Sequence, residues 1–188
     1  MGIGLGLTAA GARAQLAAGI FAGTVVATFG ASALYHRVTW SPKTRLWLRR
    51  LDHAGIFALI AGTYTPFGLF VLHGAWQRSI LATVWAGAAF GILIKLIWVA
   101  APKWLSAVIS VALGWVGTLM LPQLNRAGAV TLSLLLTGGI LNTAGATVYA
   151  RRKPDFLPTV FGYHELFHAL AIAAVAFQYA AVGLVIPH

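Results

Sequence analysis

Residues 14–36 read AQLAAGIFAGTVVATFGASALYH and contain no Lys, Arg, Asp or Glu. The hydrocarbon core of a bilayer is roughly 30 Å thick, and about 20 helical residues are needed to cross it. This stretch is long enough for that purpose and is flanked by a basic residue at each end, Arg13 and Arg37. It therefore predicts a transmembrane helix.

Five further stretches of comparable length carry at most one charged residue each. Lys95 interrupts one of them, but a lysine close to a helix end can extend its ammonium group to the lipid headgroups. The first 12 residues are too short to cross a bilayer alone, so we expect them to be the remnant of another helix. The expected spans are 14–36, 53–74, 79–101, 104–122, 128–150 and 163–186.

The composition supports the same conclusion. Of the 188 residues, 60% are hydrophobic and only 9% are charged, whereas a soluble domain has about 25% charged residues. A water-soluble enzyme and a disordered chain are both excluded by these values. We predict an all-α, polytopic helical membrane bundle that forms one integral membrane domain over residues 1–188.

The net charge of +10 does not indicate a nucleic-acid-binding protein, because the basic residues lie at the ends of the apolar runs. One set of span ends carries only Arg13, Arg78 and Arg126. By the positive-inside rule the other set is cytoplasmic and the C-terminus faces outward. That set carries ten basic residues: Arg37, Lys43, Arg45, Arg49, Arg50, Lys95, Lys103, Arg151, Arg152 and Lys153. Residues 37–50 are expected to form a basic loop.

This topology brings polar residues from three distant segments to one membrane depth. Ser32 and His36 end the first span, Asp52 begins the second, and His164 and His168 begin the last. The two histidines of the last span are four residues apart and share one helix face. With His36 they could supply three nitrogen ligands to Zn²⁺, with water in the fourth position. Asp52 could then accept a proton from that water.

Simpler interpretations of single residues stay open. A histidine at the interface can bond to headgroups or carbonyl groups, Asp52 can pair with Arg49 or Arg50, and Ser32 can be a small packing residue. His53 points to a different face from its neighbour Asp52. The string His164-Glu165-x-x-His168 also matches the H-E-x-x-H pattern of zinc proteases, in which the glutamate is the base.

Three strings resemble the bacterial hemolysin III family, the prokaryotic branch of the progestin and adipoQ receptors. They are SALYHR (32–37), RLDHAGIFALIAGTYTPF (50–67) and GYHELFHALAIAA (162–174). The resemblance covers nearly the whole chain from about residue 14. It implies a seven-helix bundle in a bacterial inner membrane with the N-terminus inside. The family has a complete first helix, so six full spans plus a remnant are expected here.

The same resemblance implies zinc near the cytoplasmic face, held by the histidines that match His36, His164 and His168. The family aspartate, here Asp52, contacts water on the zinc, and the family serine, here Ser32, lies close by. Eukaryotic relatives are linked to hydrolysis of ceramide-type amides, whereas the bacterial branch is named after a cytolytic, pore-forming activity. We expect a zinc-dependent hydrolase-like protein acting on a lipid amide. The alternatives are a pore-forming protein with structural zinc and a lipid sensor without turnover.

Overall fold

The computed structural model describes residues 9–157 and 160–187, and within these ranges every regular element is a helix. Five helices are long and apolar enough to cross a membrane. The expectation of an all-α helical membrane bundle is therefore confirmed, while most of the expected N-terminal remnant lies outside the described residues. The elements are α2 (Ala12–Arg37), α3 (Pro42–Phe70), α4 (Gly74–Ile97), α5 (Lys103–Trp115), η1 (Val116–Met120), α6 (Leu121–Leu124), η2 (Asn125–Ala127), α7 (Ala129–Arg151) and α8 (Tyr163–Val185).

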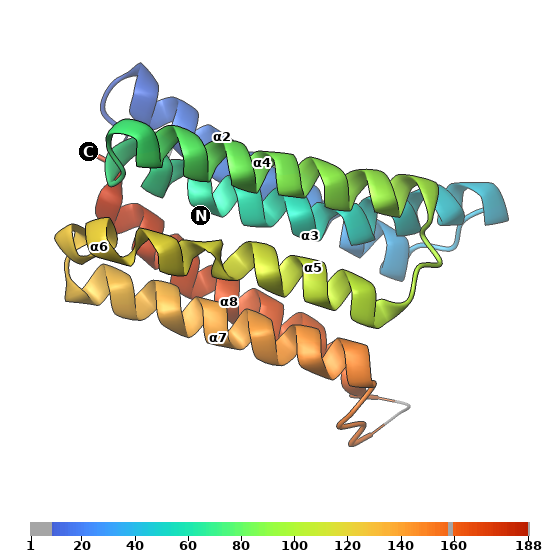
Figure 1. The fold of residues 1–188 in the computed structure, drawn as a ribbon. Coiled ribbons are helices and arrows are strands. Elements are labelled where there is room, and N and C mark those ends of the chain that lie inside the picture. Colours follow the sequence, from blue (N-terminus) through green and yellow to red (C-terminus); the bar gives the residue numbers. More distant parts are fainter. Residues whose placement is uncertain (1–8, 158–159, 188) are drawn as a thin grey trace. The chain divides into compact units, whose positions relative to one another are not determined.

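The chain forms two compact units, which divide between Ala101 and Pro102. The first contains α2, α3 and α4, and Ile186 and Pro187 return to it. In this unit α3 packs against both α2 and α4. The second unit contains the elements from α5 to α8, and α7 packs there against both α5 and α8 (Figure 1).

Two glycines allow α2 and α3 to approach closely. A Cβ atom on Gly55 would lie 3.1 Å from Thr28, and one on Gly62 would collide with the side chain of Thr24. The two glycines are seven residues apart, which is about two helical turns, so both lie on the face of α3 that contacts α2. The hydroxyl of Thr28 donates to the carbonyl of Gly55 at 3.0 Å and links the helices directly.

The middle of α3 is the most buried part of the first unit. Every residue from Ala61 to Gly68 is buried. The threonine hydroxyls in this run are satisfied locally, since Thr63 donates to the carbonyl of Leu59 and Thr65 to that of Ala61, both at 2.9 Å. Such bonds allow polar side chains and a proline to be accommodated in an apolar helical bundle.

The start of α3 differs from the sequence-based expectation of a basic loop over residues 37–50. The helix begins at Pro42, and only residues 38–41 separate it from α2. Ser41 is the N-cap, and its Oγ accepts a hydrogen bond from the backbone N–H of Thr44 at 3.3 Å. Proline suits the first helical position because its missing N–H would have no partner there.

The expected span 104–122 is a composite of helical segments. The α-helix α5 ends at Trp115 and continues as the 3₁₀ helix η1, then as α6. Pro122 adds to the irregularity near Thr118, because proline cannot donate to the carbonyl four residues earlier and its ring crowds that carbonyl. The turn before it tightens, and the backbone N–H of Leu121 donates to Thr118 instead.

Candidate metal centre

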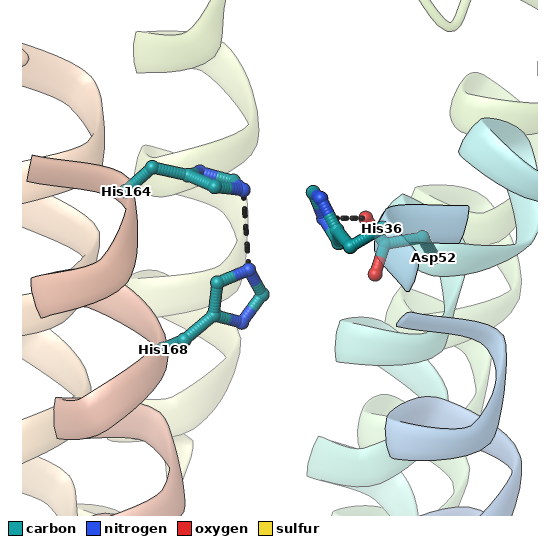
Figure 2. A network of polar contacts seen from close by, with 4 residues as sticks. All are labelled: His36, Asp52, His164 and His168. Atoms are coloured by element: carbon teal, nitrogen blue, oxygen red, sulfur yellow. Dashed lines mark hydrogen bonds and ion pairs between the residues drawn. The ribbon is translucent and has the colours of Figure 1, made fainter. Parts of the chain in front are cut away.

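The first turn and a half of α8 carries two histidines that face each other. His164 and His168 are four residues apart, and their Nε2 atoms lie 3.1 Å apart (Figure 2). Their rings are nearly perpendicular, with an interplanar angle of 86°. Both side chains are half-buried. Two imidazole nitrogens therefore point at one small volume beside α8.

This spacing matches the demands of a shared metal ion. Two nitrogens bound at about 2.0–2.1 Å in tetrahedral geometry lie about 3.3 Å apart. The observed 3.1 Å is close to that value. It also suits a direct hydrogen bond, in which the tautomers decide which ring donates. The donor set is thus suited to zinc, which favours imidazole nitrogen.

The two acidic residues near α8 hold its N-terminus. Asp155 Oδ1 accepts from the backbone N–H of Tyr163 at 2.9 Å, and Glu165 Oε2 accepts from that of Gly162 at 3.0 Å. N–H groups at a helix start have no partner inside the helix, so these carboxylates cap it. Glu165 is exposed and occupied by the backbone, which counts against a role as the base of an H-E-x-x-H protease.

An aromatic and basic cluster surrounds His164 within the second unit. Lys103 Nζ donates to the Tyr163 hydroxyl at 2.8 Å and lies 4.5 Å from the ring centre of Tyr149. The rings of Tyr149 and Tyr163 lie 6.3 and 6.2 Å from that of His164. The sequence does not predict that these three residues lie together beside His164. Only Tyr163, the direct neighbour of His164, gave a signal in the sequence.

The first unit contributes a second pair. His36 lies in the last turn of α2, and its Nε2 is 3.7 Å from Oδ2 of Asp52 in the third turn of α3 (Figure 2). The Asp52 side chain is 8% exposed and that of His36 is 35% exposed. A buried carboxylate is costly unless it has a partner, and His36 provides one. Arg50 instead lies over the ring of Trp47, at 4.6 Å.

Two of the remaining candidates, Ser32 and His53, lie close to this pair in the sequence, and His73 does not. Ser32 precedes His36 by one helical turn on α2 and is half-buried. His53, the neighbour of Asp52, is also half-buried. His73 is the N-cap of α4 and lies at the opposite end of α3 from Asp52. The structure thus brings together His36 with Asp52 and His164 with His168, each pair within its own unit.

These features define a helical membrane protein with two side-chain pairs near its helix ends. One pair consists of two imidazoles and the other of an imidazole and a carboxylate. Comparison with known sequences gives the family. Residues 4–179 match the family described as haemolysin-III related, and the chain belongs to that family. This confirms the resemblance found in the sequence.

Two relatives illustrate the match. The chain is 32% identical over 158 residues to the hemolysin-3 homolog of Bacillus subtilis (strain 168), covering 84% of this chain and 71% of that protein. It is 32% identical over 149 residues to hemolysin-3 of Bacillus cereus, covering 79% of this chain and 65% of that protein. The match thus spans just under two thirds of the Bacillus cereus protein. No solved structure matches the chain.

Proposed function

We propose that this membrane protein is a zinc-dependent hydrolase of a lipid amide, with zinc held by His36, His164 and His168. The observation that carries the proposal is the pair of Nε2 atoms 3.1 Å apart on α8. His36 is the third ligand that we propose, because the string SALYHR (32–37) resembles the segment that carries the third histidine of the family. Three protein ligands with one open position are the pattern of catalytic zinc sites.

The charge distribution supports the use of both pairs at one membrane face. The C-terminal end of α2 precedes the basic run of α3, and α8 follows the basic residues 151–153. The positive-inside rule assigns both ends to the cytoplasmic side. We therefore assign the metal centre to the cytoplasmic face of a bacterial inner membrane, with the C-terminus outside.

Asp52 and Ser32 have separate roles in the proposed amide hydrolysis. Asp52 lies 3.7 Å from His36, beyond the usual 2.7–3.2 Å of a direct N–H···O bond, and a water molecule can bridge such a gap. Asp52 accepts a proton from the attacking water and returns it to the leaving amine as the C–N bond breaks. Ser32 steadies the water or the carbonyl oxygen. Zinc, when bound, supplies Lewis-acid activation of the carbonyl and lowers the pKa of water.

The proposed substrate class rests on the family resemblance, since eukaryotic relatives are linked to hydrolysis of ceramide-type amides, and on the apolar surface of the helices. The long apolar helices expose many large hydrophobic side chains, among them Val26, Phe90 and Ile172. Membrane lipids are therefore the partners, and an acyl chain can reach the site from the bilayer. An amide linked to such a chain is the substrate we propose.

Metal analysis of the purified, detergent-solubilised protein tests the centre. We expect about one zinc per chain, lost in a His164→Ala/His168→Ala variant and kept in His73→Ala, which removes an imidazole outside the donor set. Ceramide-like amides are then added as substrates. The release of fatty acid and amine is measured with and without a zinc chelator. Absence of bound metal in folded protein would overturn the proposal.

One observation favours a second candidate function. The names of both relatives include the word hemolysin, which suggests a lytic or pore-forming protein in which zinc is structural. Dye release from liposomes separates the two functions. Leakage that persists in a variant lacking all three histidines, without amide hydrolysis by the intact protein, supports the pore.

A further inference from the structure

A groove of about 810 Å³ runs along α7 within the second unit. Its floor follows one stripe of α7 from Ile140 through Thr143 and Thr147 to Arg151, and Trp115 at the end of α5 forms one wall. At 1.5 Å per residue this stripe is about 16 Å long. The groove is thus elongated along a membrane-spanning helix and open to its surroundings.

The walls of the groove are suited to a hydrocarbon chain. Its polar side chains are satisfied within the protein, since the indole of Trp115 donates to the hydroxyl of Thr143 at 2.9 Å. Thr143 donates to the carbonyl of Gly139, and Thr147 to that of Thr143, both at 2.8 Å. An apolar ligand lying there would leave none of these donors without a partner.

One end of the groove is cationic. Arg151 and Lys153 line it and are exposed. Arg152, between them, has a φ of 55° and turns the chain at the end of α7. Within the described residues, neither cation forms an ion pair with a carboxylate. Their two charges exceed the partial negative charge of about half a unit at a helix C-terminus, so this end attracts an anion.

We propose that this groove binds one anionic phospholipid. An acyl chain lies along the stripe of α7, and the phosphate lies between Arg151 and Lys153. Basic pockets between membrane helices on the cytoplasmic side are suited to anionic headgroups, and the volume falls in the range of about 300–1,000 Å³ typical of small-molecule sites. The site is separate from the proposed metal centre, because none of the three histidines lines the groove.

Native mass spectrometry of the full chain in mild detergent tests the proposal, with phosphatidylglycerol and phosphatidylcholine of identical acyl chains as probes. We expect preferential binding of phosphatidylglycerol. An Arg151→Gln/Lys153→Gln variant should bind it about 25-fold more weakly, because each basic residue near an anionic lipid contributes about fivefold. A Lys43→Gln/Arg45→Gln variant loses equal charge in the other unit and should bind as the unmodified protein does.

The acyl-chain part of the proposal has its own test. Ala144 lines the groove and is exposed, so Ala144→Trp fills it and should weaken binding of both lipids. Ala144→Leu is a smaller change for use if the tryptophan variant does not fold, and Ser133→Trp on an exposed position of α7 is the control. Equal losses in the Lys43/Arg45 variant would reduce the effect to general surface charge, and equal binding of the two lipids would show that headgroup charge is not recognised; either result would overturn the proposal.

Discussion

His164 and His168 are positioned by one helix, whereas His36 and Asp52 are positioned by two. On α8, four-residue spacing alone puts the two rings on one face, and the caps from Asp155 and Glu165 fix where the helix begins. The pair of the first unit depends on how closely α2 approaches α3. That approach depends on Gly55 and Gly62, which lie three and ten residues after Asp52 on α3.

The two pairs differ in their donor atoms, which indicates different roles in the proposed function. The α8 pair contains only nitrogen donors, which suits metal binding. The pair of the first unit contains the one buried carboxylate of the described residues, Asp52, which suits proton transfer. Substitutions in the two regions should therefore have different effects on metal content and on turnover.

The largest expected effect is on turnover. Asp52→Asn should keep zinc and fold but lower amide hydrolysis about 100- to 10,000-fold, because general acid–base catalysis contributes about that much. Asp155→Asn is the matched control, since an amide oxygen can still accept the N–H of Tyr163. Rates of fatty acid release from both purified variants provide the measurement. Unchanged turnover in Asp52→Asn would remove Asp52 from the mechanism.

The next effect is on metal affinity. His168→Ala leaves one nitrogen on α8, and His36→Ala leaves the α8 pair intact. Each should weaken zinc binding by more than the 10- to 100-fold typical of losing a supporting group, and His168→Ala more than His36→Ala. Competition with a chromophoric chelator measures both affinities. If His36→Ala binds zinc as the unmodified protein does, the centre belongs to α8 alone.

Much of this arrangement could be predicted from the sequence. Charged residues bound the apolar runs, so the expected span 128–150 lies within one residue of α7, and the His164–His168 spacing gives the α8 pair directly. The charges of Arg45, Arg49 and Arg50 favour a loop, and the structure instead begins α3 at Pro42, where Ser41-Pro42 is a helix-start signal.

Other features depend on contacts between helices that periodicity does not encode. The cluster of Lys103, Tyr149 and Tyr163 is assembled by the packing of α5, α7 and α8. The helix α5 ends at Trp115, where the backbone N–H of Val116 donates to the carbonyl of Leu113, and the apolar run 104–122 does not indicate this end. The sequence also does not predict that Glu165 caps α8. A glutamate at this position can cap the helix or face a metal, and the side-chain rotamer decides between the two.

A smaller effect concerns the stability of the first unit. Gly62→Ala puts a Cβ into Thr24, whose hydroxyl is bonded to the carbonyl of Phe21 at 2.8 Å and resists movement. We expect the free energy of unfolding to fall by about 1–3 kcal/mol, as overpacking does. Thermal and denaturant unfolding in detergent measure the change.

The controls for this prediction lie on the same helices. Gly23→Ala on α2 meets nothing within 4 Å and should be neutral or slightly stabilising, because alanine favours helices over glycine. Thr24→Ala should restore only part of the stability of Gly62→Ala, because the Cβ atom of residue 24 would still lie 2.9 Å from the new Cβ, whereas Thr24→Gly removes that atom. If both glycine variants behave alike, close approach of α2 to α3 does not position His36 and Asp52.

The smallest effect separates the two roles open to Glu165. If this residue caps α8, Glu165→Gln should leave stability and hydrolysis unchanged, because glutamine also accepts the N–H of Gly162. Glu165→Ala should lower stability by about 0.5–1 kcal/mol, as cap removal does, with turnover kept. A base in an H-E-x-x-H site would behave in the opposite way, since glutamine cannot accept the proton. Loss of turnover in Glu165→Gln at full stability would transfer the proton-accepting role from Asp52 to α8, and the division between the two regions would fail.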